Sequence, residues 1–432
     1  MTTRHRRIPP GPDEKYTTSQ GLLNWIGDQF KRFGDTYKAS IDGTSVYVTR
    51  NPRYAEHVLR ENWGNYVKGQ AIKRVALLLG NGLMVTEGEF WKGQRQMIQP
   101  AFHRNAVAAL IKIIATANAA LLKSWEQAAR KNESVNVTVD ISHMVLNVVL
   151  VSIFGEDYEH VGPHFSVLSE DAGRTLEFAQ TFRSLGQLVL QVAARRREQN
   201  IISTDILGML MEARDRNSGR GMPDRQLVNE IMTLIVAGHE TTASTLNWVW
   251  YLISQHPEVE EKLSSELDSL CASEPPAVDD LPKFTYTRGL IEEALRLYPP
   301  GWLMTRRALK DDLIGDYFVP AGTEIYIPPY FIQRHPELWD APDRFDPDRF
   351  APDRSQNRDR LAMLPFSAGP RNCIGEILAR VEMQIHLIMV ARRLRLRSVE
   401  TKLPELDIGV NLRSKNNFIM TPEIKMLAER CC

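Results

Sequence analysis

The sequence has few cysteines and none of the cysteine patterns of a secreted or zinc-binding protein. Only four occur in 432 residues, namely Cys271, Cys373, Cys431 and Cys432. Their spacing fits neither a disulfide framework nor a Cys-x-x-Cys zinc site. We therefore expect no structural disulfides and no zinc site. A reducing compartment suits such a chain, and we expect the protein to be cytoplasmic.

Long apolar runs and an excess of one charge are also missing. No run of 18 apolar residues is present, and the basic, polar residues 1–7 are followed by no apolar segment. This pattern predicts neither a transmembrane anchor nor a standard secretion signal. Lys plus Arg and Asp plus Glu both number 53, so the formal net charge is zero. A neutral chain has no general attraction to nucleic acid or to anionic membranes, and we expect no nucleic-acid partner.

A strong interdomain linker is absent as well. The length alone would allow two or three domains. The best linker candidate, residues 272–283, is short and is typical of a loop between two helices. We therefore predict a single domain over residues 1–432. Residues 1–20 are expected to be flexible, because the cluster Pro9-Pro10-Gly11-Pro12 interrupts any regular element.

The most informative stretch is residues 366–376, which read Phe-Ser-Ala-Gly-Pro-Arg-Asn-Cys-Ile-Gly-Glu. Cys373 lies between Gly369 and Gly375, and an apolar helical pattern begins directly after it. Backbone N–H groups at such a loop-to-helix junction can stabilise a thiolate, the form of cysteine that binds iron. Glycines let the backbone approach a flat macrocycle closely. The pattern predicts a thiolate ligand of haem iron, although a lone cysteine is usually a small buried apolar residue.

The spacing Phe-x-x-Gly-x-Arg-x-Cys-x-Gly in this stretch resembles the haem-binding signature of the cytochrome P450 family. The resemblance implies a mainly α fold with a small β-rich lobe, and haem b with Cys373 as the axial ligand. Arg371 would then pair with a haem propionate, because a guanidinium suits carboxylates. Phe366 would keep water away from the sulfur.

Residues 223–256 predict one long helix that would cross a whole domain. Its apolar sequence is interrupted by Ala237-Gly-His-Glu-Thr-Thr242. A glycine and an acid inside an apolar helix are unfavourable locally, and such violations are expected at functional sites. The Thr241 hydroxyl can bond back to the Ala237 carbonyl and bend the helix. The stretch resembles the family's oxygen-activation motif, which implies that Glu240 and Thr241 relay protons; a kinked core helix is the alternative.

Trp91 and Arg95 are four residues apart and so share one helix face. An indole N–H and a guanidinium on one face could hold a carboxylate, whereas in isolation an exposed cation–π pair would be the usual interpretation. In the resemblance both contact a haem propionate. Arg306 matches a further propionate position, with the adjacent Arg307 as the alternative.

Glu293 and Arg296 face each other at i and i+3 of a predicted helix over residues 284–298. Alone, this pair is common on surface helices. In the resemblance the two residues join Arg349 in a buried polar network that stabilises the haem-binding core. All members of such a network need partners, so we expect the three residues to be needed together.

The segment from 155 to 200 is shorter than the family's usual lid over the substrate entrance. The basic run 195–197 within it is expected to be a solvated helix end. An apolar pocket suits a lipophilic small molecule, and both a fatty-acid-like chain and a cyclic terpenoid stay open. The candidate pocket residues are Leu234, Ala237, Gly238, Leu303, Met304 and Phe418.

The resemblance implies a monooxygenase that uses O2 and inserts one oxygen atom into its substrate. The chain carries no flavin or iron–sulfur segment, so electrons from NAD(P)H would arrive through a ferredoxin or flavodoxin with its reductase. Such an acidic partner could dock on arginines near the cysteine loop; these are Arg354, Arg358, Arg360 and Arg380. The alternatives are a peroxide-driven or isomerising haem-thiolate enzyme and a non-catalytic haem-binding sensor. We expect a monomer.

Overall fold

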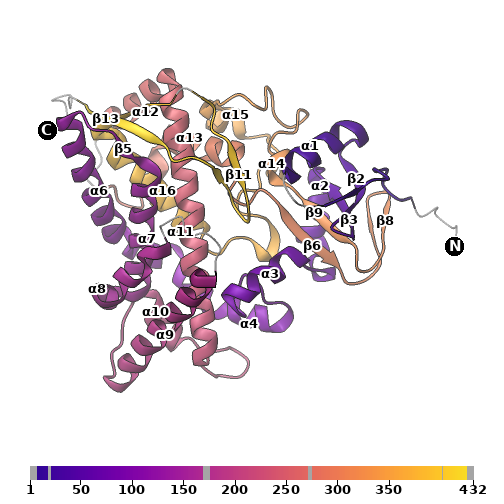
Figure 1. Cartoon of the computed structure of the whole chain (residues 1–432), viewed down its shortest axis with the longest axis horizontal. Coiled ribbons are helices and arrows are strands. Elements are labelled where there is room, and N and C mark those ends of the chain that lie inside the picture. Colours follow the sequence, from indigo (N-terminus) through magenta and orange to yellow (C-terminus); the bar gives the residue numbers. More distant parts are fainter. Residues whose placement is uncertain (1–6, 18–20, 169–175, 271–274, 401, 426–432) are drawn as a thin grey trace.

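The computed structural model describes residues 7–17, 21–168, 176–270, 275–400 and 402–425. The molecule is mainly helical, with the helices gathered on one side and a small β-rich lobe on the other (Figure 1). Helix α11 (Asp224–Gln255) runs through the helical side from end to end. This arrangement confirms the predicted fold class.

Helix α11 is the central element of the core. Its 32 residues span roughly 48 Å at 1.5 Å per residue. It packs most extensively on α7 (Val137–Phe154), and both helices are buried over most of their length. A Cβ on Gly238 would lie 3.3 Å from the Val149 side chain. The glycine therefore allows the two helices to approach closely.

The other helices cover α11 or connect it to the lobe. The longer ones are α4 (Gly88–Ile98), α5 (Arg104–Ala109), α6 (Ile111–Lys131), α9 (Leu176–Glu198), α10 (Ile206–Glu212), α12 (Pro257–Ser269), α13 (Thr285–Leu297) and α16 (Glu376–Arg393). The shorter ones are α2 (Pro52–Glu56), α8 (Tyr158–Val161), α14 (Pro329–Ile332) and α15 (Pro352–Ser355). Apolar side chains of α6, α7, α11, α13 and α16 form the largest core cluster.

The lobe is built on a six-stranded sheet in the order β1-β2-β3-β9-β6-β4. Its strands are β1 (Lys15–Tyr16), β2 (Thr36–Ile41), β3 (Thr44–Thr49), β4 (Tyr66–Lys68), β6 (Met304–Ala308) and β9 (Glu324–Ile327). Helix α1 (Leu22–Phe33) packs its apolar side on this sheet. Strands β2 and β3 form a hairpin: they pair antiparallel around Asp42 and Gly43, which both have positive φ.

Three smaller sheets complete the fold. Strand β13 (Ile419–Ile424) pairs with both β10 (Leu394–Ser398) and β5 (Val135–Asn136). The remaining two are hairpins: β7 (Asp312–Ile314) with β8 (Tyr317–Val319), and β11 (Leu406–Ile408) with β12 (Leu412–Ser414). The tip between β11 and β12 reaches back to α11, as described below.

Glycines bound the helix that follows β4. Helix α3 (Gln70–Leu79) has Gly69 as N-cap and Gly80, at φ 62°, as C-cap. Further along the chain, Leu110 separates α5 from α6.

The described part of the N-terminal segment is anchored rather than free. Lys15 and Tyr16 pair with β2, and the Pro10 carbonyl accepts a 2.8 Å hydrogen bond from Lys38 N–H. A Cβ on Gly11 would lie 1.9 Å from the Lys38 carbonyl oxygen, so only glycine fits there. Backbone hydrogen bonds thus hold part of residues 7–17 against β2, and the flexibility of residues 1–20 stays a prediction. Residues 1–6 and 18–20 lie outside the described residues, as do Cys271, Cys431 and Cys432.

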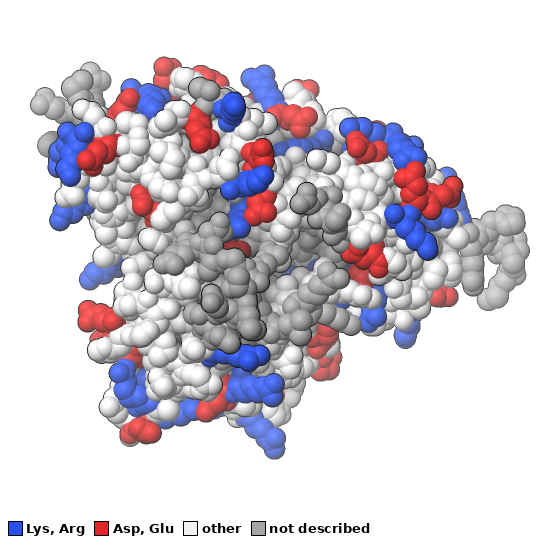
Figure 2. Space-filling view, in the orientation of Figure 1, with Lys and Arg blue, Asp and Glu red and all other residues white. Residues whose placement is uncertain are grey.

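One helical stretch, Val137–Leu168, has the length and apolar composition of a membrane span. However, 61% of its most apolar window is buried inside the protein, and α7 within it packs on both α6 and α11. This packing is typical of a core helix. Across one face of the molecule, acidic and basic side chains are intermixed (Figure 2), as the balanced composition suggests.

The basic run 195–197 is not simply a solvated helix end. Arg196 is 2% exposed, and its guanidinium bonds Asp157 at 2.7 Å, Asp205 at 2.7 and 2.8 Å and the Phe154 carbonyl at 2.7 Å. Only Arg197 of the run behaves as a solvated residue, being paired with the exposed Asp224. The end of α9 is therefore fixed to the end of α7 by a buried charge cluster.

Candidate functional site

The loop that carries Cys373 is tightly constrained. The Cys373 N–H donates to the Phe366 carbonyl at 2.9 Å, which closes the loop just before α16 begins at Glu376. Gly369 has φ 74°, and a Cβ there would lie 1.9 Å from the Leu59 carbonyl oxygen. Gly369 therefore cannot carry a side chain, as the sequence pattern predicted.

Groups around the Cys373 sulfur shift the pKa of its thiol in opposite directions. Burial raises the pKa of the thiol, and the nearby Glu376 charge raises it further. Backbone N–H groups of Gly375 and Glu376, together with Arg95, act in the opposite direction. Cys373 is nevertheless solvent-accessible. The thiol is therefore accessible to solvent, although the protein around it desolvates it enough to raise its pKa.

Arg95 lies beside the cysteine on α4, as the predicted helix face requires. Its guanidinium donates to the Asn372 carbonyl at 2.7 Å and to the Asn372 side-chain oxygen at 2.9 Å. It therefore connects α4 to the residue that precedes Cys373. Trp91, from the same face, is 4% exposed, and the guanidinium of Arg371 stacks on its indole ring at 4.4 Å.

Arg371, Arg306 and Lys68 form a cluster of cations, of which Arg306 is buried and the other two are half-buried. Arg371 is ion-paired with Glu87 and donates to the Thr86 carbonyl at 3.5 Å. Burial, and then repulsion from Arg371, lower the pKa of Arg306 to about 10 and that of Lys68 to about 7. Among the described residues, Glu87 interacts electrostatically with all three cations and Glu230 interacts with Lys68, so three cations face two carboxylates. No sequence pattern singled out Lys68, because nothing local distinguishes it from other lysines.

On α11, the predicted hydrogen bond from the Thr241 hydroxyl to the Ala237 carbonyl is present, at 2.8 Å. Ala237 and Glu240 are exposed, although the helix around them is buried. The Asn411 side chain, at the tip between β11 and β12, donates to the Glu240 carboxylate at 2.7 Å. Sequence reasoning missed Asn411, which only the tertiary structure brings to α11.

His239 and Gly238, from the same motif, face α7 instead. His239 is buried against α7, where its Nε2 lies 2.9 Å from the Ser142 hydroxyl, and burial lowers its pKa to about 4. The open side of Gly238 faces Val149 of α7. Gly238 therefore serves helix packing, whereas Ala237, Glu240 and Thr241 present the accessible part of the motif.

The candidate pocket residues divide into two groups. Leu234, on α11, joins the apolar cluster that includes Leu83 and Trp91, while Leu303 and Met304 are half-buried at the lobe. Phe418 lies in the main core instead, with its ring stacked on Tyr251 at 5.1 Å. This packing occupies the Phe418 ring and does not support its assignment to a substrate pocket.

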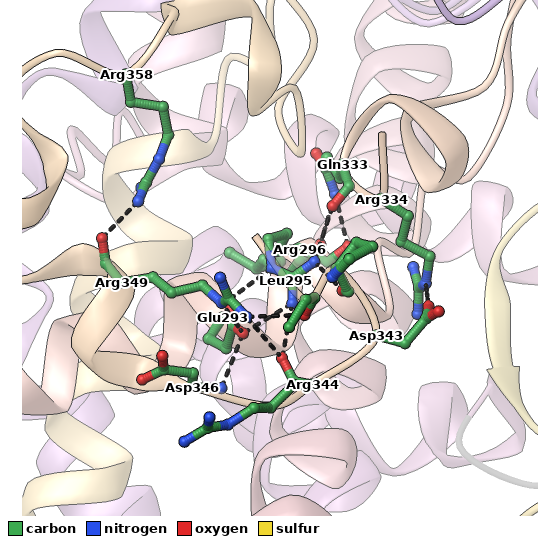
Figure 3. Close-up of polar contacts among 12 residues, drawn as sticks. Glu293, Leu295, Arg296, Gln333, Arg334, Asp343, Arg344, Asp346, Arg349 and Arg358 are labelled. Carbon is green, nitrogen blue, oxygen red and sulfur yellow. Dashed lines mark hydrogen bonds and ion pairs between the residues drawn. The ribbon is translucent and has the colours of Figure 1, made fainter. Parts of the chain in front are cut away.

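The predicted network of Glu293, Arg296 and Arg349 is present and buried (Figure 3). Glu293 accepts from Arg296 at 2.6 and 2.8 Å and from Arg349 at 3.3 Å. Arg296 also donates to the carbonyls of Gln333 and Pro342. Gln333, which sequence reasoning missed, donates to two carbonyls of α13 and accepts from Leu364 N–H. The network therefore joins α13 to the segment that leads to the cysteine loop.

A groove of about 390 Å³ opens on the outer side of the cysteine loop. It is lined by Trp63, Trp91, Lys92, Arg95, Gln96, Gln99, Pro370 and Asn372. The arginines expected to dock a partner are already engaged in part: Arg354 pairs with Asp346, Arg358 stacks on Trp339, and Arg380 pairs with Glu292 and Glu376. Arg360 is exposed, and the groove offers further polar surface beside the cysteine loop.

Comparison with known proteins identifies the family. The family model "Cytochrome P450" matches residues 15–188 and 164–421. Cyclooctat-9-en-7-ol 5-monooxygenase of Streptomyces melanosporofaciens is 34% identical, over 85% of this chain and 83% of that protein. Pentalenene oxygenase of Streptomyces avermitilis is 32% identical, over 87% of this chain and 86% of that protein.

Solved structures agree on the fold. The heme domain of cytochrome P450DA superposes with a TM-score of 0.83 at 22% identity, and the match covers 97% of this chain and 98% of that one. The expected haem, O2 and external supply of electrons follow from the family. The chain belongs to the cytochrome P450 family and is a haem-thiolate monooxygenase.

Proposed function

We propose that Cys373 is the axial haem ligand and that Lys68, Arg306, Arg371 and Arg95, with Trp91, hold the haem propionates. The observation that carries this proposal is the imbalance of charge beside the cysteine loop. Three cations, Lys68, Arg306 and Arg371, face two carboxylates there, Glu87 and Glu230, and burial raises the pKa of Glu230 to about 7. Buried charges need partners, and the two propionates of haem b would supply them. Bound haem supplies O2 activation, with the thiolate favouring cleavage of the O–O bond.

Besides holding the haem, the protein is proposed to deliver protons. We assign Glu240 and Thr241 to this role, because they are the accessible polar side chains in the middle of α11. The Asn411 amide orients the Glu240 carboxylate, and the Ala237 carbonyl orients the Thr241 hydroxyl. An oriented acid and alcohol in a protected site can pass protons in a fixed direction.

The proposed substrate is a cyclic terpenoid. The two bacterial relatives are named for cyclooctat-9-en-7-ol and pentalenene, which are terpenoids. The apolar cluster around Leu234, Leu83 and Met84 suits such a molecule. A fatty-acid-like substrate is the second candidate from the sequence, and no contact in the structure favours it. The short lid over 155–200 stays a prediction.

Electrons are proposed to come from NAD(P)H through a ferredoxin or flavodoxin and its reductase. The groove at Trp63, Lys92 and Asn372 is the proposed docking site, because it lies directly outside the cysteine loop. Lys92 and Arg95 give it a positive character that suits an acidic partner. We further propose that the protein acts as a monomer in the cytoplasm.

A spectral titration of the purified holoprotein tests the proposal. Pentalenene, cyclooctat-9-en-7-ol and a series of long-chain fatty acids are added separately, and the haem Soret band is followed. A saturable shift with the terpenoids alone supports the substrate class. A shift with the fatty acids alone contradicts it.

Two further experiments test the haem ligand and the reaction. Cys373→Ser should remove the ferrous carbon monoxide spectrum typical of a thiolate ligand. Product formation with hydrogen peroxide alone, at the rate seen with redox partners, would favour the peroxide-driven alternative.

A further inference from the structure

Glu230 is a buried acid on α11 that oxygen chemistry does not use. It lies in the second turn of the helix and is 0% exposed. One carboxylate oxygen accepts from the Leu83 N–H at 2.7 Å, and the other accepts from the Gln226 side chain at 2.6 Å. Burial raises the pKa of Glu230 to about 7. Burying an acid is unfavourable unless hydrogen bonds compensate for the water that the carboxyl group loses.

Lys68 also binds Leu83, the residue whose N–H donates to Glu230. Its ammonium donates to the Leu83 carbonyl at 2.9 Å and to the Thr86 carbonyl at 3.4 Å. Both backbone groups of Leu83 are therefore held by side chains: the carbonyl by the half-buried Lys68 of β4, and the N–H by the buried Glu230 of α11. Gln226 adds a third connection by donating to the Asn81 carbonyl at 2.8 Å.

The loop formed by residues 80–87 lies flat on α11 as a result. A Cβ on Gly82 would lie 2.0 Å from the Thr233 hydroxyl and 2.8 Å from the Asn229 carbonyl. Only glycine allows this approach. Leu83 and Met84 pack with Leu234 of α11 in one apolar cluster, which also includes Leu185 and Val189 of α9. The position of the loop therefore decides the shape of the apolar surface around Leu234.

We propose that Glu230 is a positioning residue for substrate selection: with Lys68 it holds Leu83 and so fixes loop 80–87 as one wall of the substrate pocket. This wall determines which lipophilic molecules reach the haem, without any change in the residues that hold the haem. This inference rests on the proposed haem site. A haem spectrum that stays intact therefore separates failure of the inference from failure of the proposed function.

The test uses two iron-binding probes of different size, imidazole and 4-phenylimidazole, on the holoprotein. Their dissociation constants are measured from the Soret shift, and the ratio between them reports the width of the pocket. Glu230→Leu removes the acceptor for Leu83 N–H, and we expect the ratio to change by about tenfold in favour of the larger probe. Glu230→Gln keeps an acceptor oxygen and should stay within about threefold of wild type.

Two more variants keep the proposal falsifiable. Gly82→Ala lifts the loop from α11 without changing Glu230, and it decides the matter if Glu230→Leu does not fold. Asp224→Asn, an exposed acid on the same helix, is the matched control. Hydrogen exchange of the peptide covering 80–87 should rise about tenfold in Glu230→Leu and Gly82→Ala only.

The proposal is overturned if both Glu230→Leu and Gly82→Ala keep the wild-type probe ratio while the thiolate spectrum is intact. It is also overturned if Asp224→Asn changes the ratio to the same extent, or if Glu230→Gln behaves as Glu230→Leu does.

Discussion

Both carboxylate oxygens of Glu293 accept hydrogen bonds from the guanidinium of Arg296, at 2.6 and 2.8 Å, and both side chains are 0% exposed. Arg349 and the Asp346 N–H complete the coordination of the carboxylate. A buried ion pair of this kind adds little net stability as a whole, but removing one member leaves an uncompensated charge. The position of the segment before the cysteine loop therefore depends on this ion pair and on helix α13, which carries it.

Glu293→Ala should destabilise the protein by about 3–5 kcal/mol, because the two arginines then lose their buried counter-charge. Urea unfolding of the holoprotein, followed by circular dichroism and by haem absorbance, measures this change. Asp28→Asn, which removes an exposed pair with Lys31, should leave the midpoint unchanged. Equal midpoints for Glu293→Ala and wild type would contradict the structural role.

Thr241→Ala should separate electron consumption from product formation. The variant loses the hydroxyl that donates to the Ala237 carbonyl, and with it the proposed proton path. Product per NADPH should fall by at least about tenfold, with hydrogen peroxide formed instead. Thr241→Ser keeps the hydroxyl and should retain most of the coupling. Wild-type coupling in Thr241→Ala would contradict the assigned role.

His386 should make the protein sensitive to acid. The Trp250 indole N–H donates to His386 Nε2 at 2.8 Å, so Nδ1 carries the proton and donates to Asn118 at 2.6 Å. Burial lowers the pKa of His386 to about 3, from 6.5. Between these values the unfolded state binds more protons, so the free energy of unfolding falls as the pH drops below about 6.5.

The slope should reach about 1.4 kcal/mol per pH unit from this one group. Urea unfolding of wild type and His386→Gln at several pH values from 7 to 4.5 measures it. The variant is expected to be less stable at neutral pH but to lose less stability on acidification. Parallel pH profiles for the two proteins would show that His386 does not titrate in this way.

Arg196→Ala should lower stability far more than Arg197→Ala. Arg196 is 2% exposed and compensates Asp157 and Asp205, whereas Arg197 is 45% exposed. We expect a loss of about 3–5 kcal/mol for Arg196→Ala, because Asp205 loses its cation and Asp157 keeps only Arg195. Thermal unfolding of the two variants compares them directly. Similar melting temperatures would mean that the buried cluster contributes no stability.

The sequence alone determined the contacts and turns that involve residues close together in the chain. The hydrogen bond from Thr241 to Ala237 and the pair Glu293–Arg296 were predictable, because residues three and four apart meet on a helix. The constrained turn at Gly369 before Cys373 was predictable for a similar reason, since a turn restricts which residues fit. These short-range relations also carried the family resemblance, and with it the fold class.

Only the tertiary structure decided which distant residues meet. Lys68 joins Arg306 and Arg371, Asn411 reaches Glu240, and Arg196 is buried by Asp157 and Asp205. Nothing in the local sequence marks Lys68 or Asn411, and Arg196 lies in a basic run of the kind that is most often solvated. Their roles arise when helices and strands pack and remove water from particular charges. The energy of a charge depends on that desolvation and on its partners, which no local spacing specifies.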